Sequence, residues 1–251
     1  MSIRKGLKCL VTGAGRGIGR ALVAELHARG AVVYALSKNP DNLKKLKIEF
    51  PKVVPICADL GSVEDTRRAL EPIEAVDCLI NNAGIFEPGD FLEATSESFD
   101  KQFNINLRSA LTVSQITAKK MIARGNGGSI VNISSISGQR PEHGIAIYCC
   151  TKAAIDMLTK CMALELGPHK IRVNAVAPAN VDTDLNQPGS YGEEEKEKVE
   201  QNQKLLLQRT PTGTLWMPMS DIVNTTLFLA SDLTSQITGQ VLAVDGGYLA
   251  N

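Results

Sequence analysis

Short apolar runs alternate with longer amphipathic segments along the whole chain. These runs are continuous rather than alternating apolar and polar, which is typical of strands covered on both faces of a sheet. They occupy residues 7–13, 31–36, 53–58, 76–81, 128–134, 170–177 and 240–246. We therefore expect seven buried strands separated by helices.

The segments between these runs have helical patterns. Residues 17–30 and 114–125 are examples, and the second ends in Gly125 after basic residues, as helices often do. Regular alternation of strand and helix predicts right-handed crossovers and an α/β fold with a doubly wound parallel sheet, flanked by helices on both faces. Because the chain has no composition shift, repeat or linker, we expect a single Rossmann domain over residues 1–251.

Two segments depart from this regular alternation of strand and helix. Residues 184–212 form a charged, turn-rich insertion after the sixth strand, where α/β folds place binding loops, so we expect a solvated segment that covers a ligand. The helix expected over 148–167 carries apolar residues on more than one face. A contact between subunits would explain this excess, and so would a thick intramolecular layer.

Composition argues against several functional classes. Lys plus Arg and Asp plus Glu number 27 each, and aromatic residues make up 4% of the chain, so a nucleic-acid partner is not expected. The start of the chain has no apolar signal region, and no stretch of 18 apolar residues occurs, so we expect neither secretion nor a membrane span.

Cysteine and histidine usage favours a reduced, cytoplasmic protein without a bound metal. The six cysteines form no C-x-x-C pair, and most lie in apolar segments, where buried packing is expected. The adjacent Cys149 and Cys150 could be redox-active, but packing is the simpler interpretation. The three histidines are scattered and lack neighbouring ligands at metal-binding spacing; they are His27, His143 and His169.

A glycine-rich turn follows the first expected strand. The sequence TGAGRGIG at 12–19 leads directly into a helix, where backbone N–H groups at the helix N-terminus can hold a phosphate. Its glycines are Gly13, Gly15, Gly17 and Gly19, a spacing that differs from G-x-G-x-x-G. Its position in the first βαβ unit predicts a dinucleotide site.

The end of the second strand favours NADPH over NADH. Enzymes that bind NAD usually carry an acidic residue there for the ribose 2′-hydroxyl. This chain has Ser37 and Lys38 instead, and Arg16 projects from the glycine turn. A serine and two cations suit a 2′-phosphate, which a carboxylate would repel.

Six motifs in this order resemble the short-chain dehydrogenase/reductase family, over about residues 7–248. TGAGRGIG is similar to the family's cofactor loop. ADL at 58–60 is similar to the motif whose aspartate, here Asp59, holds the adenine amino group. NNAG at 81–84 is similar to the family's fourth-strand motif. Asn106 in FNINL stands at the family's active-site asparagine position. PANVDT at 178–183 resembles its P-G-x-x-x-T segment, with Ala179 in place of the glycine.

The resemblance also implies a catalytic set. Ser135 lies thirteen residues before Tyr148, and YCCTK at 148–152 is similar to the family's Y-x-x-x-K. The set is Asn106, Ser135, Tyr148 and Lys152. With the glycine turn and the two cations, the implied cofactor contacts are Gly13, Gly15, Arg16, Gly17, Ile18, Gly19, Ser37, Lys38, Asp59, Leu60, Asn82, Ala83, Gly84, Tyr148, Lys152, Pro178, Val181 and Thr183.

The Tyr148–Lys152 spacing has a chemical reason, because residues four apart share a helix face. A phenol with a pKa near ~10 is a poor proton shuttle at neutral pH, so we expect the Lys152 cation to lower the pKa of Tyr148. Tyr148 would then give a proton to a carbonyl oxygen, and Ser135 would hydrogen-bond that oxygen. The resemblance implies that Lys152 also binds the nicotinamide ribose and that Asn106 helps to hold a water. Thr151 and the two cysteines need no role.

Within the family the chain is most similar to the dicarbonyl/L-xylulose reductase group, notably over YCCTKAAIDMLTKCMALELGPHKIRVNAVAP. That group implies a homotetramer that uses NADPH to reduce α-dicarbonyls and some ketoses. Glu142 and Ile145 stand where the group has an apolar residue and a histidine, which weakens the expectation of ketose reduction. Candidate substrate contacts are Ser135, His143, Ile145 and, in the covering loop, Tyr191.

Three other functions stay open on the sequence. A 3-oxoacyl-carrier-protein or steroid-type reductase would use the same machinery, although no clear basic docking patch accompanies it. A non-catalytic dinucleotide sensor would bind without turnover. A dehydrogenase that oxidises with NAD is opposed by the missing acid after the second strand.

Overall fold

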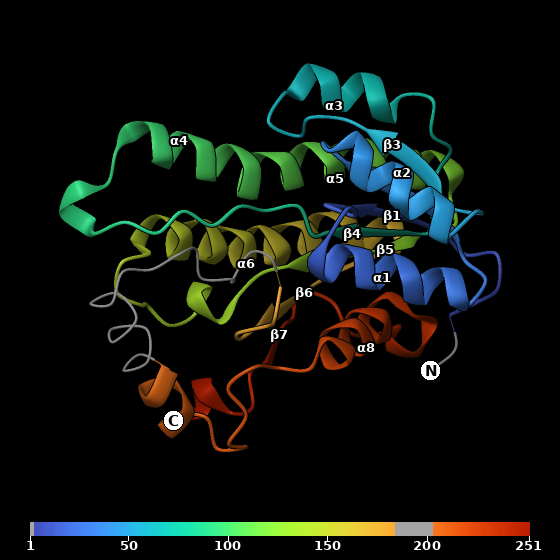
Figure 1. Cartoon of the computed structure of the whole chain (residues 1–251). Helices are drawn as coiled ribbons and strands as arrows, with labels where there is room; N and C mark the ends of the chain where they lie inside the picture. The colour runs from blue at the N-terminus through green and yellow to red at the C-terminus, as the bar shows by residue number, and fades with distance from the viewer. Residues whose placement is uncertain (1–2, 184–202) are drawn as a thin grey trace.

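The seven apolar runs form one sheet of parallel strands in the order β3-β2-β1-β4-β5-β6-β7. The computed structural model describes residues 3–183 and 203–251 (Figure 1). All seven expected strands and the doubly wound fold are confirmed. The strands are β1 Lys8–Thr12, β2 Val32–Ser37, β3 Val54–Cys57, β4 Cys78–Asn81, β5 Gly128–Ile133, β6 Ile171–Pro178 and β7 Val241–Val244.

Helices cover both faces of the sheet (Figure 1). They are α1 Gly17–Ala28, α2 Pro40–Glu49, α3 Val63–Leu70, α4 Ser96–Phe103, α5 Ser109–Arg124, α6 Ala146–Leu166 and α8 Met219–Ala230, and residues 203–208 are also helical. The α5 helix ends at Gly125, whose left-handed backbone (φ 79°) allows the chain to turn, as expected.

Two apolar clusters lie on opposite faces of the sheet. Leu22 of α1 and Ile222 of α8 pack on one face, whereas Val113 and Met121 of α5 pack on the other, and all four side chains are fully buried. Successive residues of a strand point to opposite faces, so a strand between two helical layers is apolar at every position. This explains the continuous apolar runs of the central strands.

The expectation of full burial is wrong for the two edge strands. In β3 only Ile56 is partly covered, and in β7 Leu242 is exposed. An edge strand pairs with a neighbour on one side only, so its apolar residues stay more accessible. Apolar continuity therefore does not distinguish a central strand from an edge strand.

A π-helical turn, Asn104–Arg108, joins α4 to α5. This wider turn carries Asn106, whose side chain is 2% exposed and faces α6. Such turns shift the helical register by one residue and are frequent at functional sites. The sequence pattern did not predict it.

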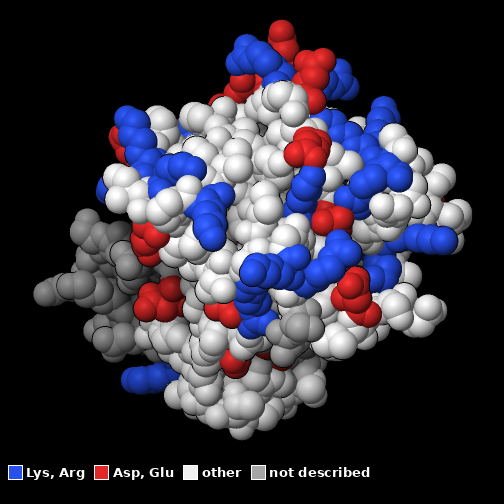
Figure 2. Space-filling view, turned by 90° about the vertical axis from the view of Figure 1, so that its right-hand side faces the viewer, with Lys and Arg blue, Asp and Glu red and all other residues white. Residues whose placement is uncertain are grey.

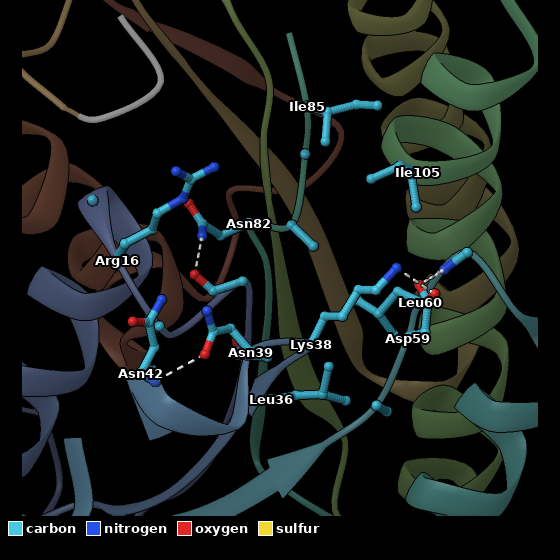
Figure 3. A pocket seen from close by; sticks show the side chains of 18 of the residues that line it. Arg16, Leu36, Lys38, Asn39, Asn42, Asp59, Leu60, Asn82, Ile85 and Ile105 are labelled. Atoms are coloured by element: carbon cyan, nitrogen blue, oxygen red, sulfur yellow. Dashed lines mark hydrogen bonds and ion pairs between the residues drawn. The ribbon is translucent and has the colours of Figure 1, made fainter. Parts of the chain in front are cut away.

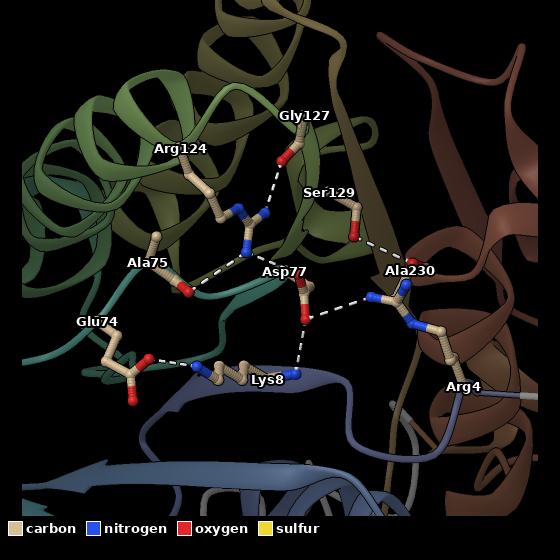
Figure 4. A network of polar contacts seen from close by, with 9 residues as sticks. All are labelled: Arg4, Lys8, Glu74, Ala75, Asp77, Arg124, Gly127, Ser129 and Ala230. Atoms are coloured by element: carbon tan, nitrogen blue, oxygen red, sulfur yellow. Dashed lines mark hydrogen bonds and ion pairs between the residues drawn. The ribbon is translucent and has the colours of Figure 1, made fainter.

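A polar network joins the amino ends of the central strands (Figure 4). Asp77 accepts a hydrogen bond from the backbone N–H of Lys8 at 2.9 Å and from Arg124 at 2.7 Å. The guanidinium of Arg124 also donates to the backbone oxygens of Ala75 and Gly127 at 3.3 and 2.9 Å. The network fixes the start of β1 against the chain that enters β4 and β5. Figure 2 views this end of the molecule, where basic side chains have carboxylates among them.

The cysteines are less buried than expected. Cys9 and Cys78 are fully buried on the paired strands β1 and β4, but Cys57, Cys150 and Cys161 are exposed, because they lie on an edge strand or on the outer face of α6. All six are free thiols. Within 3–183 and 203–251, no helix has the length and apolar content to cross a bilayer.

Candidate active site

A cleft of about 1100 Å³ opens along the carboxyl ends of β1, β2, β3 and β4 (Figure 3). Parallel sheets bind ligands at this edge, beside the point where the strand order reverses. Predicted cofactor residues that line it are Gly13, Gly15, Arg16, Gly17, Ile18, Ser37, Lys38, Asp59, Leu60, Asn82, Ala83, Gly84 and Thr183.

The glycine turn has a shape that other residues would obstruct. A Cβ on Gly13 would lie 2.9 Å from Ala83 Cα, and one on Gly15 would lie 2.8 Å from Ser37 Oγ. Gly13 also has a left-handed backbone, with φ 62°. The exposed amides at the start of α1 therefore face an unobstructed cradle, which fits a dinucleotide pyrophosphate.

Gly19 does not line the cleft, and its role is in packing. A Cβ there would lie 2.3 Å from the backbone oxygen of Gly13 and 2.5 Å from Asn82 Nδ2. Gly19 thus lets α1 approach the glycine turn closely. It therefore supports the glycine turn on the side away from the cleft.

The side chains of Thr12 and Asn82 lock β1 to β4 at the floor of the cleft. Thr12 Oγ1 accepts hydrogen bonds from the N–H groups of Asn82 and Ala83 at 3.0 and 3.1 Å. Asn82 Nδ2 donates to the backbone oxygens of Thr12 and Gly13 at 3.1 and 3.2 Å. The TGAGRGIG and NNAG motifs therefore form one structural unit.

Two of the predicted cofactor residues pair with each other. Lys38 Nζ lies 2.7 Å from Asp59 Oδ2, at the end of the cleft formed by β2 and β3 (Figure 3). This bond and the N–H of Gly61 lower the pKa of Asp59, so it is ionised at neutral pH. Arg16 lies on the glycine turn, apart from this pair (Figure 3).

Sequence reasoning missed the start of α2. Asn39 caps this helix by accepting hydrogen bonds from the N–H groups of Asp41 and Asn42, and both asparagines line the cleft. Asn42 packs against Gly15, since a Cβ on that glycine would come within 3.0 Å of Asn42 Cβ. The Asn-Pro pair at 39–40, a helix-start signal, could have revealed it.

A smaller pocket of about 200 Å³ adjoins the cleft. Ser135, Tyr148 and Lys152 line it together, as the family resemblance implied, and so do Pro178 and Val181. Ser135 follows β5, and the other two residues occupy the first two turns of α6. The Tyr148 ring packs edge-on against Phe86 with centroids 5.1 Å apart, and Lys152 Nζ lies 5.5 Å from its centroid.

Asn106 lies behind this pocket, fixed by backbone and side-chain contacts. It accepts a hydrogen bond from the N–H of Ile85 at 2.8 Å and donates to the backbone oxygen of Ile85 at 3.0 Å. Its Nδ2 also donates to Thr151 Oγ1 at 3.1 Å. The expectation that Thr151 needs no role is wrong, because its fully buried hydroxyl orients Asn106.

The pKa of Tyr148 departs from expectation. Burial raises it to about 12, and the nearby Glu142 charge adds to the rise, whereas a hydrogen bond with Ser135 opposes it. Burial lowers the pKa of Lys152 to about 8, and the charge of Asp156 partly offsets that change. The predicted lowering of the Tyr148 pKa is therefore wrong for this structure: burial of the phenol is the largest cause and raises the pKa, so Tyr148 is neutral at neutral pH.

Asp156 is a further group that sequence reasoning missed. It lies one helical turn after Lys152 and is 8% exposed, and its Oδ1 has no hydrogen-bond partner among residues 3–183 and 203–251. Burial raises its pKa, and Lys152 acts against that rise. A carboxylate four residues after a lysine on one helix is the signal that could have found it.

The candidate substrate contacts are only partly placed. His143 and Ile145 line the smaller pocket beside Ser135, and Ile145 is buried while His143 is exposed. Tyr191 lies outside the described residues, as does the 184–202 part of the insertion predicted over 184–212. In residues 3–183 and 203–251, no cluster of three metal-ligating side chains occurs.

Comparison with known proteins agrees with this geometry. A family model described as enoyl-(acyl carrier protein) reductase matches residues 13–249. The chain is 48% identical to the L-xylulose reductase of Homo sapiens over 245 residues, which covers 98% of this chain and 97% of the relative. It is 46% identical to carbonyl reductase (NADPH) 2 of Sus scrofa over 246 residues, or 98% of each protein.

A solved structure is similar over nearly its whole length. It is a gluconate 5-dehydrogenase from Burkholderia cenocepacia in complex with NADP and tartrate, with a TM-score of 0.90 and 30% identity over 99% of this chain and 97% of that one. The chain belongs to the short-chain dehydrogenase/reductase family. It is an oxidoreductase, and its cofactor is a nicotinamide dinucleotide.

The buried cation of Lys152 predicts a pH-dependent stability. Its pKa falls from 10.5 to about 8, so the folded protein binds fewer protons than the unfolded chain between these values. Burying the charge therefore destabilises the fold below pH 8, and this cost disappears as the pH rises to about 10.5. Lys152 also donates to the backbone oxygen of Ile133 at 2.9 Å, which offsets part of the cost.

We expect Lys152→Met to increase the free energy of unfolding by about 2 kcal/mol at pH 7, and by much less at pH 10. Chemical denaturation of the protein without cofactor at both pH values measures this. The matched control is Lys45→Met on the exposed face of α2, which should show no such pH dependence. An equal effect of Lys152→Met at both pH values would contradict the prediction.

Proposed function

We propose that this protein is an NADPH-dependent carbonyl reductase that acts on small α-dicarbonyl compounds and on ketoses such as L-xylulose. The observation that carries the proposal is the convergence of Ser135, Tyr148 and Lys152 on one small pocket at the mouth of the dinucleotide cleft. Similarity to an L-xylulose reductase and to a carbonyl reductase supports the substrate class.

The residues of the cleft hold the cofactor. The glycine turn and the start of α1 bind the pyrophosphate, while Asp59 accepts a hydrogen bond from the adenine amino group. Lys38 and Arg16, which line the cleft apart from each other, would attract the ribose 2′-phosphate. When bound, NADPH supplies the hydride for the carbonyl carbon.

Tyr148 and Ser135 act on the carbonyl oxygen. Tyr148 is a neutral phenol at neutral pH, so its proton is available for the oxygen as negative charge develops there. Ser135 Oγ also reaches the pocket and donates a hydrogen bond to the same oxygen. Helix α6 holds Tyr148, and Ser135 lies two residues after the end of β5.

Lys152 and Asn106 support the proton transfer. The Lys152 ammonium lies against the Tyr148 ring and stabilises the phenolate that remains after proton donation. It also holds the nicotinamide ribose through its remaining donors. Asn106 is oriented by Ile85 and Thr151, and we infer that it holds a water that returns a proton through Lys152.

The decisive experiment compares Tyr148→Phe with the unaltered protein. With NADPH we expect reduction of diacetyl and L-xylulose, and little reduction of acetoacetyl thioester, because the pocket of about 200 Å³ suits small substrates. Tyr148→Phe should lower kcat by about 10³-fold or more while NADPH affinity changes less than about threefold. Stopped-flow kinetics and NADPH fluorescence titration measure both.

Two outcomes would contradict this proposal. Tight NADPH binding with no turnover of any of the three substrates would favour a sensor. Rapid turnover of the thioester alone would favour an acyl-carrier reductase. Phe99→Tyr changes one hydroxyl group at an exposed position of α4. It is the control for such a change away from the pocket and should leave kcat unchanged.

Cofactor preference tests the roles of Lys38 and Arg16. Removing either cation should raise the KM for NADPH about tenfold and leave the KM for NADH nearly unchanged, since NADH lacks the 2′-phosphate. Arg16→Ala and Lys38→Ala are the variants, with Lys45→Ala as the control outside the cleft. An equal effect on both cofactors, or a preference of the unaltered protein for NADH, would reject these roles.

We also infer a homotetramer, which the outer face of α6 supports. Cys150, Met157, Cys161 and Leu164 share one helix face, and Met157 and Leu164 are 59% and 81% exposed. Apolar side chains grouped on one face of a helix indicate a contact with another subunit.

Light scattering should therefore give a mass of about 108 kDa, four copies of the 27.0 kDa chain. We expect Leu164→Glu to shift the protein to smaller assemblies, because it places a charge in the apolar contact. Ile48→Glu introduces the same charge on exposed α2 and should leave the mass unchanged. A monomer in the unaltered protein would exclude the tetramer.

A further inference from the structure

Glu142 introduces a carboxylate into the smaller pocket. It belongs to the segment between Ser135 and Tyr148, is half-buried, and lines the pocket beside both residues. Its Oε1 accepts a hydrogen bond from Ser137 Oγ at 2.9 Å, and Ser137 Oγ lies 3.2 Å from Ser135 Oγ. The carboxylate is therefore two hydrogen bonds away from the serine proposed to bind the carbonyl oxygen.

The other charges around this pocket do not neutralise Glu142. Among the described lining residues, Lys152 is the only Lys or Arg, and its ammonium donates to the backbone oxygen of Ile133 and lies against the Tyr148 ring. Asp156 is the charged group paired electrostatically with that lysine. The remaining titratable neighbours of Glu142 are Tyr148, Cys149 and the exposed His143.

An anionic substrate would meet unfavourable electrostatics in this pocket. A carboxylate attached to a carbonyl bound at Ser135 would share the pocket with Glu142, and no arginine from residues 3–183 and 203–251 lines the pocket to pair with it. Two like charges in a partly desolvated site repel strongly, because the effective dielectric constant is far below that of water. A neutral substrate avoids this repulsion, and its hydroxyl groups can donate to the free lone pairs of Glu142.

We propose that Glu142 is a specificity-determining residue that admits uncharged dicarbonyl and hydroxy-carbonyl substrates and rejects those with a carboxylate beside the carbonyl. This inference rests on the proposed reductase function and defines its substrate class more narrowly.

Diacetyl and pyruvate form a matched pair for testing this selection. They share one methyl ketone, and pyruvate has a carboxylate where diacetyl has an acetyl group. The measured quantity is the ratio of kcat/KM for pyruvate to that for diacetyl with NADPH at pH 7. The ratio removes effects that a substitution has on both substrates alike. The lower intrinsic reactivity of pyruvate is the same for every variant, so it cancels when the ratios of two variants are compared.

We expect Glu142→Gln to raise this ratio by about tenfold or more, since glutamine keeps the shape and hydrogen bonding but removes the charge. Glu142→Asp keeps the charge and should leave the ratio within about threefold of the unaltered protein. Glu64→Gln neutralises an exposed carboxylate at the start of α3 and is the control for net charge. An unchanged ratio in Glu142→Gln, with diacetyl still reduced, would overturn the proposal.

A binding measurement tests the role of Glu142 even if the proposed reductase function is wrong. Saturation-transfer NMR of the NADP-loaded protein gives the affinities for pyruvate and diacetyl without turnover. If the unaltered protein reduces neither compound nor L-xylulose, but Glu142→Gln binds pyruvate at least about tenfold better relative to diacetyl, the reductase proposal fails and Glu142 keeps its selective role. An unchanged binding ratio would reject that role even without turnover.

Discussion

The hydrogen bonds between Thr12 and the 82–83 segment hold the two central strands together at the edge where the site is built. Thr12 Oγ1 satisfies two backbone N–H groups after β4, and Asn82 Nδ2 in return satisfies two backbone oxygens at the glycine turn. Without these two side chains, the backbone N–H groups and the backbone oxygens would be unpaired polar atoms at the end of the sheet. Because β1 and β4 lie between the two halves of the sheet, this junction positions the larger cleft relative to the smaller pocket.

The fold and most of the site could be predicted because they depend on local sequence. A parallel strand between two helical layers is buried on both faces and therefore consists mostly of apolar residues. The central strands could thus be predicted from continuous apolar runs. The glycine turn was equally readable, since Gly13 and Gly15 stand where a Cβ would clash. Ser135, Tyr148 and Lys152 were found through a family spacing, and folding brings the three to one pocket.

What sequence reasoning missed depends on contacts between distant segments or on burial. The Lys38–Asp59 pair joins the ends of two strands, and the Thr151–Asn106 bond joins two helices, so no local pattern reveals either contact. The Tyr148 pKa was misjudged because the sequence shows which charge stands nearby but not how much water remains around the phenol. Likewise, β3 and β7 are apolar like the central strands, and only the strand order identifies them as edges.

The π-helical turn at Asn104–Arg108 has a consequence for chain-length changes in this region. Each residue of an α-helix advances the rotation by about 100°, so the extra residue offsets the faces of α4 and α5 by that angle. Deleting one residue within 104–108 would restore regular α-helix but rotate everything before it about the axis. Either Asn106 would turn away from α6, or the packed face of α4 would turn outwards. Homologous recombination or loop grafting across this segment therefore has to preserve its length.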